Sequence, residues 1–243
     1  MEFLNNLIEY YDELYPVSKS QKKFFEDLLK QYEMPTRILG IGCASGFFEH
    51  SLALKGYDVT GIESSRAMLE SANRRRRLPN TAIRFFQMDT IEMSRFLGKK
   101  FYNVISCLNS QIIFIHDETL LRKFFFDCKA LLTDNGTLVI QLGNFSSFEQ
   151  NHTFEIPTHK SIRVSLISKI TETTDGKFLL NQELDRGDNH FIQVLKDVLV
   201  LPITPDMIEN FAKEAGFKSI NFYEGWTQNP FTGNTNNLVC VLQ

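Results

Sequence analysis

The chain has 243 residues, which is enough for one large domain or for a domain with an insertion. Hydrophobic residues make up 43% and charged residues 23%, as in an ordinary globular protein, and the net charge of −3 argues against nucleic-acid binding, because nucleic-acid binders carry a basic face. No apolar run approaches the roughly 18 residues that cross a bilayer, and the N-terminus lacks a signal-peptide pattern, so we expect a cytoplasmic protein with no membrane partner.

The spacing of the cysteines indicates whether they could bind a metal. The four cysteines lie far apart, with no CxxC pair and no grouping with histidine of the kind that binds metal. We therefore expect reduced, buried thiols and no metal site. These residues are Cys43, Cys107, Cys128 and Cys240.

Two helices are expected first. Apolar residues recur at helical spacing up to Pro16, and again from Phe24 until Pro35. We expect residues 1–35 to form an N-terminal helical cap.

An alternation of buried strands and helices follows. This order predicts a doubly wound α/β fold, with a parallel sheet covered on both faces. Its ligand is expected at the carboxyl ends of the strands, where the winding reverses. The predicted strands are 37–41, 58–62, 83–87, 101–107 and 137–141, and the predicted helices are 46–55, 65–76 and 117–132.

The alternation of strands and helices stops after residue 150. Three strand-like runs separated by the turn-like stretches "ETTDGK" and "GDN" predict a three-stranded antiparallel insertion over 151–200. The α/β pattern returns over 201–243, with a helix opened by Thr204-Pro205 and two strands near 218–224 and 238–242. The main domain is thus expected to comprise 36–150 and 201–243.

One stretch carries the ligand prediction. Gly42 ends a strand, and Glu63 ends the next strand 21 positions later, which matches the turn-and-acid spacing of a dinucleotide site. A dinucleotide site also needs a third glycine for the pyrophosphate, and Phe47 stands there. A phosphate-free adenosyl ligand, S-adenosylmethionine, does not need that glycine. Glu63 would accept both ribose hydroxyls, Asp89 would accept the adenine amino group, and Ile62 and Met68 would contact the ring.

These segments resemble the class I (Rossmann-like) S-adenosylmethionine-dependent methyltransferases. The resemblance covers nearly the whole chain and is carried by "ILGIGCASGFFEHSLALKGYDVTGIES", "FFQMD", "FYNVISCLNSQIIFI", "LLTDNGTLVI" and "ITPDMIENFAKEAGFKSINFY". It implies a seven-stranded sheet whose last strand is antiparallel. It also implies contacts to the cofactor, and to its product S-adenosylhomocysteine, through Gly42, Cys43, Ala44, Gly46, Glu63, Ser64, Met68, Asp89, Thr90, Leu108 and Asn109.

The chain departs from the family pattern at several positions. The acidic residue that usually stands two positions before the first glycine is Gly40, which removes a carboxylate near the methionine part of the cofactor. The usual middle glycine is Ala44, an exchange that is tolerated if φ there is negative. Tyr102 replaces an aspartate, and Asp134-Asn135 replaces Pro-Gly.

Residues for the methyl acceptor are harder to assign. His116 and His190 are candidate bases, although His116 suits a capping role beside Asp117 equally well. Candidate substrate contacts, each with a packing or solvation role as the alternative, are Tyr11, Tyr15, Arg163, Arg186 and Tyr223.

The resemblance implies methyl transfer to a nitrogen or oxygen atom of a small molecule. The insertion is expected to cover the substrate or to form an oligomer contact, which leaves a homodimer open. The alternatives are an RNA or protein methyltransferase and a catalytically silent, cofactor-binding regulator.

Overall fold

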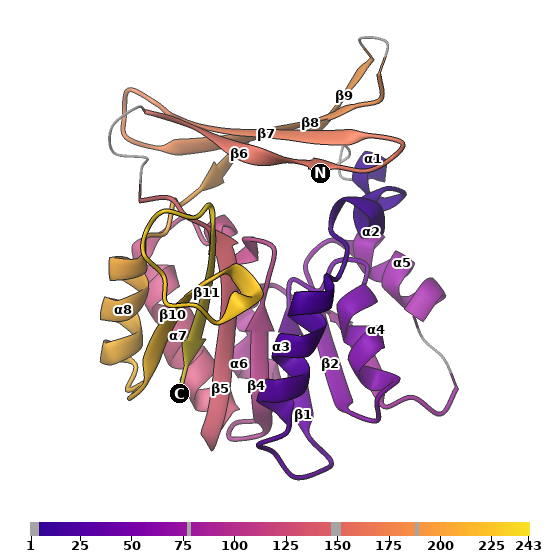
Figure 1. Ribbon diagram of the computed structural model, residues 1–243, viewed down its shortest axis with the longest axis vertical. Coiled ribbons are helices and arrows are strands. Elements are labelled where there is room, and N and C mark those ends of the chain that lie inside the picture. Colours follow the sequence, from indigo (N-terminus) through magenta and orange to yellow (C-terminus); the bar gives the residue numbers. More distant parts are fainter. Residues whose placement is uncertain (1–4, 77–78, 147–151, 188–189) are drawn as a thin grey trace.

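A computed structural model describes residues 5–76, 79–146, 152–187 and 190–243. Its centre is a seven-stranded sheet in the order β10-β11-β5-β4-β1-β2-β3 (Figure 1). These strands are β1 (Arg37–Ile41), β2 (Asp58–Glu63), β3 (Ile83–Gln87), β4 (Tyr102–Cys107), β5 (Leu132–Gly143), β10 (Ile220–Glu224) and β11 (Asn237–Leu242). β1 pairs in parallel with both β2 and β4, whereas β11 runs antiparallel to β5 and β10. The predicted doubly wound sheet with an antiparallel last strand is confirmed.

Helices cover both faces of this sheet because successive strand residues point to opposite sides. Ile38 and Val104 pack with the helices of one face, whereas their neighbours Leu39 and Ile105 pack with those of the other. The first face carries α3 (Lys19–Leu29), α4 (Phe47–Ala53) and α5 (Arg66–Arg76). The second carries α6 (Met93–Phe96), α7 (Glu118–Leu131) and α8 (Pro205–Glu214).

Helix starts follow ordinary capping chemistry. The Ser18, Asp117 and Thr204 side chains accept hydrogen bonds from the backbone N–H groups of Gln21, Leu120 and Met207. Asp117 is therefore the cap that its sequence position predicts. The described residues of the main domain also form the short 3₁₀ helices η2 (Thr90–Glu92), η3 (Gln111–Phe114) and η5 (Gly225–Thr227).

A second sheet lies across the carboxyl ends of the parallel strands (Figure 1). It has four antiparallel strands, in the order β6-β7-β8-β9, where three were predicted. They are β6 (Thr153–Lys160), β7 (Ser165–Glu172), β8 (Phe178–Asp185) and β9 (Phe191–Val200). The unpredicted strand β6 contains Pro157, which breaks a strand pattern, and lies at a sheet edge where proline is tolerated.

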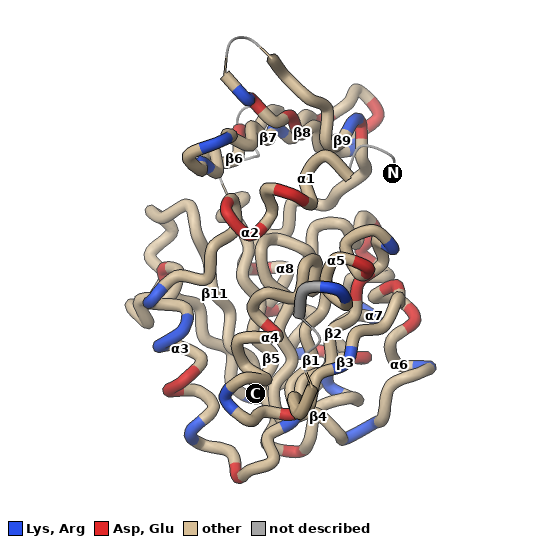
Figure 2. Tube along the Cα trace, turned by 90° about the vertical axis from the view of Figure 1, so that its right-hand side faces the viewer, with Lys and Arg blue, Asp and Glu red and all other residues tan. Residues whose placement is uncertain are grey.

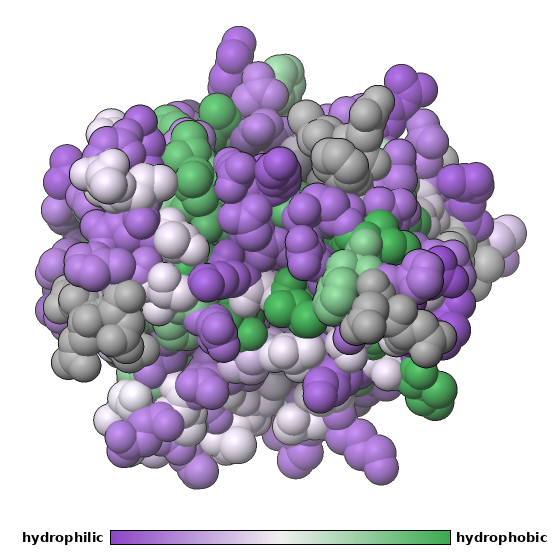
Figure 3. Space-filling model, turned by 90° about the horizontal axis from the view of Figure 1, so that it is seen from above, coloured by the Kyte–Doolittle hydropathy of each residue, from purple (hydrophilic) through white to green (hydrophobic). Residues whose placement is uncertain are grey.

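The first helical segment is divided into α1 (Asn5–Ile8) and α2 (Tyr11–Leu14), which lie beneath the four-stranded sheet (Figure 2). Leu7 and Leu14 from these helices pack with Leu166 and Leu184 from the sheet above and with Met68 from α5. The outer face of the four-stranded sheet is mainly hydrophilic, with separate hydrophobic patches (Figure 3). No helix in the described part of the chain is long and apolar enough to cross a membrane.

Candidate active site

A cavity of about 370 Å³ lies where the winding of the main sheet reverses, between β1 and β4. Its floor comes from loops after β1, β2, β3 and β4, one wall comes from α1 and α2, and its roof comes from the four-stranded sheet. A smaller cavity of about 40 Å³ adjoins it at Tyr11, Gly42 and Asn109.

The turn after β1 is built from left-handed backbone. Gly42, Ala44 and Gly46 have φ of 64°, 46° and 68°. A Cβ on Gly42 would lie 2.8 Å from Gln111 Cγ, so the turn requires glycine at that position. The expectation that Ala44 has a negative φ is wrong, because its φ is positive. This conformation instead directs the Ala44 N–H to Glu63, while the Ala44 methyl group is buried against the cap.

Glu63 at the end of β2 faces this turn. Its Oε2 accepts a hydrogen bond from Ala44 N (2.9 Å), and its Oε1 accepts one from Ser65 N (2.8 Å). The side chain is mostly buried, and this burial raises the pKa of the carboxyl group while the backbone donors oppose the rise. The side chain and backbone of Ser64 also hydrogen-bond to Glu63, so the carboxylate is held in place at the cavity wall.

Asp89 lies after β3 and has two tasks. Its Oδ1 accepts a hydrogen bond from Ile91 N at 3.1 Å, which caps η2, and its side chain also lines the main cavity. The other carboxylate oxygen is open to a ligand donor. Capping and ligand binding are thus compatible at this residue.

Most of the predicted cofactor residues lie together. The main cavity is lined by Gly42, Ala44, Glu63, Ser64, Met68, Asp89, Thr90 and Asn109. Cys43 and Leu108 line the small cavity. Gly46 lines neither, because it lies under Phe85, whose Cζ would be 2.5 Å from a Cβ at that position. Its positive φ and this close approach give it a structural reason to be glycine.

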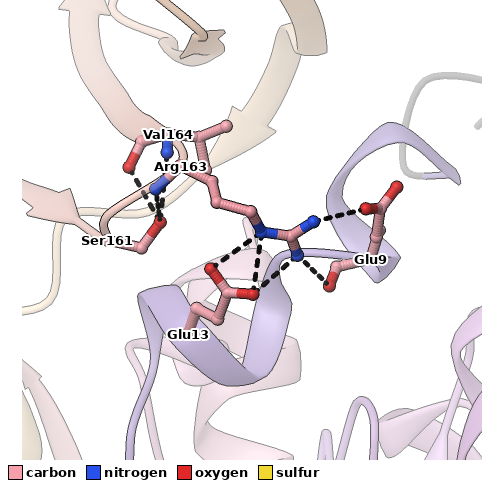
Figure 4. Close-up of polar contacts among 5 residues, drawn as sticks. All are labelled: Glu9, Glu13, Ser161, Arg163 and Val164. Atoms are coloured by element: carbon pink, nitrogen blue, oxygen red, sulfur yellow. Dashed lines mark hydrogen bonds and ion pairs between the residues drawn. The ribbon is translucent and has the colours of Figure 1, made fainter.

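The predicted acceptor residues divide into two groups. Tyr11, Tyr15 and His116 line the main cavity, whereas Arg163, Arg186, His190 and Tyr223 are not part of its lining. Arg163 instead pairs with Glu9 and Glu13 on the cap, with nitrogen–oxygen distances of 2.6 Å to each (Figure 4). Tyr223 packs on the face of the main sheet that α3, α4 and α5 cover. Arg186 and His190 lie at the β8–β9 turn.

Several lining residues were not predicted. They come from η3, β5 and the four-stranded sheet, and they are Gln111, Gln141, His159, Ser168 and Gln182. Ile156 and His159 both line the cavity although they lie three positions apart, because the β6–β7 pairing is irregular between them. Simple strand alternation would place these two residues on opposite faces.

Tyr15 and His159 are in contact where the N-terminal cap meets the four-stranded sheet. Their rings lie 4.4 Å apart, and Tyr11 stacks on Tyr15 at 4.8 Å. Burial lowers the pKa of His159, although a hydrogen bond with the Leu14 backbone opposes this. Burial also raises the pKa of Tyr15 to about 12. Both side chains are therefore neutral near pH 7.

The charge of the lining discriminates between ligand classes. Among the described residues, the main cavity presents the carboxylates of Glu63 and Asp89 and no lysine or arginine. A phosphate-bearing ligand would meet no cation there, whereas an adenosyl sulfonium suits two carboxylates beside the apolar side chains of Ile62 and Met68. The described residues also hold no cluster of metal-ligating side chains.

Comparison with known proteins agrees with this chemistry. Residues 38–136 match the model of a methyltransferase domain. The chain is 27% identical over 219 residues to a protein of Geobacillus sp. (strain WCH70) assigned as a methyltransferase, which covers 79% of this chain and 87% of that protein. Residues 38–136 therefore carry a methyltransferase domain, and the chain as a whole has the fold of S-adenosylmethionine-dependent methyltransferases.

Other relatives show the range of this methyltransferase fold. A glycine/sarcosine N-methyltransferase of Aphanothece halophytica is 26% identical over 161 residues, which cover 63% of this chain and 60% of that protein. The CcbJ methyltransferase of Streptomyces caelestis superposes with a TM-score of 0.80 at 16% identity, over 99% and 97% of the two chains. The S-adenosylmethionine-bound amino pentose methyltransferase CalS10 of Micromonospora echinaspora superposes with a TM-score of 0.65 at 18% identity, over 93% and 92%.

Proposed function

We propose that this methyltransferase transfers a methyl group to the nitrogen of a small-molecule amine enclosed in the 370 Å³ cavity. The position of the cavity between three parts of the chain carries this proposal. Residues from the main sheet, the cap and the four-stranded sheet surround it on separate sides, which suits a small acceptor better than an RNA or protein chain. The relatives that act on glycine, sarcosine and an amino pentose support an amine acceptor.

The cofactor end of the cavity is assigned from the geometry of the carboxylates. Glu63, which lines the main cavity at the end of β2, would accept the two ribose hydroxyls. Asp89 would accept the adenine amino group, and Met68 would contact the adenine face. The N-terminal cap (1–35) and the insertion (151–200) would act as covers over a cofactor-binding domain made of 36–150 and 201–243.

The acceptor end is lined mainly by neutral polar and aromatic groups. Gln182 Nε2 donates to Ser168 Oγ at 3.0 Å, and the Gln182 side chain also hydrogen-bonds to Tyr15, so these groups would form a polar wall against the acceptor. His159 and Tyr15 lie on the same side of the cavity. Because the pKa of His159 is lowered, its imidazole is neutral at pH 7 and can accept the proton that an ammonium group must lose before it reacts.

When bound, S-adenosylmethionine supplies an electrophilic methyl group on a sulfonium. The chain's own residues have three tasks: to align the acceptor nitrogen, to exclude water and to accept one proton. Alignment alone can lower a barrier by about 7–11 kcal/mol, so a single indispensable side chain is not required. We assign His159 as the proton acceptor, with His116 as the alternative on the same cavity.

The test measures S-adenosylhomocysteine formation with a panel of amino acids, amino sugars, other amines, phenols, carboxylates and tRNA. We expect turnover with a small amine. In His159→Gln, the rate below pH 7 should fall more steeply than in wild type, whereas His116→Gln should keep the wild-type pH dependence. The reverse result would assign the proton acceptor to His116. Turnover on tRNA alone would overturn the proposal. Cofactor binding without turnover on any acceptor would instead identify a silent regulator.

A further inference from the structure

Glu49 is a buried carboxylate on α4 with no role in the site described so far. Its side chain is only 5% exposed. It lies against Gly40 of β1, where a Cβ would be 2.9 Å from Glu49 Cγ and nearer still to Oε1. The Glu49 carboxylate therefore occupies the space that a side chain at position 40 would need.

This carboxylate faces the end of the site beyond the Gly42 turn. Glu49 lines the small cavity, which shares Tyr11, Tyr15, Gly42 and Asn109 with the main cavity. Glu63 and Asp89, assigned to the nucleoside end of the cofactor, line only the main cavity. A ligand held by those two acids would extend its other end past Gly42 toward Glu49.

The surroundings of Glu49 lack a compensating charge. Among the described residues, no lysine, arginine or histidine forms an ion pair with it. Glu49 interacts electrostatically with three ionisable groups, none of which is a cation: Glu63, Cys43 and Tyr11. Burial raises the pKa of Glu49 to about 7. A backbone N–H hydrogen-bonds to the Glu49 carboxylate, but no cation offsets its charge. A buried carboxylate without a cationic partner is costly, so a cationic ligand group would be stabilised there.

We propose that Glu49 pairs with the α-ammonium group of S-adenosylmethionine and thereby supplies, from helix α4, the carboxylate that is missing at Gly40. This inference rests on the cofactor assignment of the main cavity. It predicts that positions 40 and 49 form one functional unit: a carboxylate can stand at either position, and the two side chains cannot stand together.

The first experiment separates the two ends of the cofactor by calorimetric titration. S-adenosylhomocysteine carries the ammonium group, whereas 5′-methylthioadenosine keeps the adenosine and the sulfur but lacks the amino-acid part. In Glu49→Gln, which preserves the shape of the side chain, we expect the Kd for S-adenosylhomocysteine to rise at least tenfold and the Kd for 5′-methylthioadenosine to change less than twofold. Retained 5′-methylthioadenosine binding also shows that the variant is folded.

The second experiment moves the carboxylate. Glu49→Ala should lose S-adenosylhomocysteine affinity, and Gly40→Asp alone should disturb the site through its contact with Glu49. The double variant Gly40→Asp/Glu49→Ala should recover affinity to within about threefold of wild type. Such recovery from two harmful changes would not follow from a purely structural role of Glu49.

The outcomes are distinct. Equal loss of both ligands in Glu49→Gln, unchanged S-adenosylhomocysteine affinity in that variant, or no recovery in the double variant would each overturn the assignment of Glu49. If wild-type protein binds neither ligand, the cofactor assignment of the main cavity fails, and the inference fails with it.

Discussion

Glu63 connects two loops of the candidate site through a single side chain. Its two hydrogen bonds with Ala44 and Ser65 hold the loops after β1 and β2 against each other. The N–H groups of Ala44 and Ser65 are buried, and an unpaired buried N–H is costly. Both donors therefore depend on the Glu63 carboxylate as their acceptor.

Replacing Glu63 by alanine should therefore weaken S-adenosylhomocysteine binding by about 1–3 kcal/mol, because the ribose loses its acceptors and two backbone donors lose theirs. Isothermal titration calorimetry measures this change. Glu70→Ala is the control, since Glu70 is an exposed glutamate on the neighbouring helix that pairs with Arg66. Equal affinity in the two variants would show that Glu63 does not hold the ribose.

Glu49 also predicts how stability depends on pH in the absence of cofactor. Its folded-state pKa of about 7 lies above the ordinary value of 4.5, so the folded protein binds more protons than the unfolded chain between these values. The contribution of this group to stability is full below pH 4.5 and is lost as the pH rises to 7, by about 3 kcal/mol at about 1.4 kcal/mol per pH unit.

Denaturant unfolding at pH 5 and pH 8 tests this expectation. Glu49→Gln cannot ionise, so its unfolding free energy relative to wild type should increase from pH 5 to pH 8. Because the other ionisable groups are the same in both proteins, the difference isolates Glu49. A difference that is constant with pH would show that the Glu49 carboxyl group titrates normally.

At the scale of elements, Arg163 connects the four-stranded sheet to the cap. Its guanidinium pairs with Glu9 and Glu13 and lies 4.5 Å from the centre of the Tyr10 ring (Figure 4). These ion pairs are exposed and contribute little to global stability. Their geometric effect is local, since they hold α1 and α2 against the roof of the cavity.

Arg163→Ala should leave the thermal midpoint almost unchanged while accelerating amide exchange at residues 5–14 and the dissociation of bound S-adenosylhomocysteine. Hydrogen exchange with mass spectrometry and stopped-flow displacement measure these effects. Arg186→Ala is the matched control, because Arg186 lies on the same sheet but at the β8–β9 turn. Identical behaviour of the two variants would exclude a role for Arg163 in holding the cap.

At the scale of the molecule, the cavity is enclosed by segments that are far apart in the chain. Tyr15 of the cap meets His159 of the insertion over a floor made by the main sheet. A ligand bound between these parts stabilises them together, because it binds the folded state only.

A 100-fold excess of S-adenosylhomocysteine over its Kd should add about 2.7 kcal/mol to the unfolding free energy. For a protein of this size, each kcal/mol raises the midpoint by about 2–4 °C. Differential scanning calorimetry should therefore show a shift of several degrees, which 5′-methylthioadenosine also produces at an equal multiple of its Kd. No shift at millimolar ligand would contradict cofactor binding.

The main sheet, and the residues that follow its strands at the candidate site, could be predicted from the sequence. Strands such as 37–41 and 58–62 are short apolar runs that pair in parallel under helices, so their order and spacing are visible along the chain. Gly42 and Glu63 follow these strands directly. Their meeting at one edge follows from the topology of a parallel sheet.

The cavity residues from the four-stranded sheet and the burial of Glu49 could not be predicted from local sequence patterns. β6 was missed because of Pro157, and the irregular pairing beside it turns His159 toward the cavity. Glu49 looks like an ordinary acidic residue in the first turn of a helix, and its burial against Gly40 arises from the packing of α4 on the sheet. Contacts between residues of different elements depend on that packing, and local sequence patterns do not encode it.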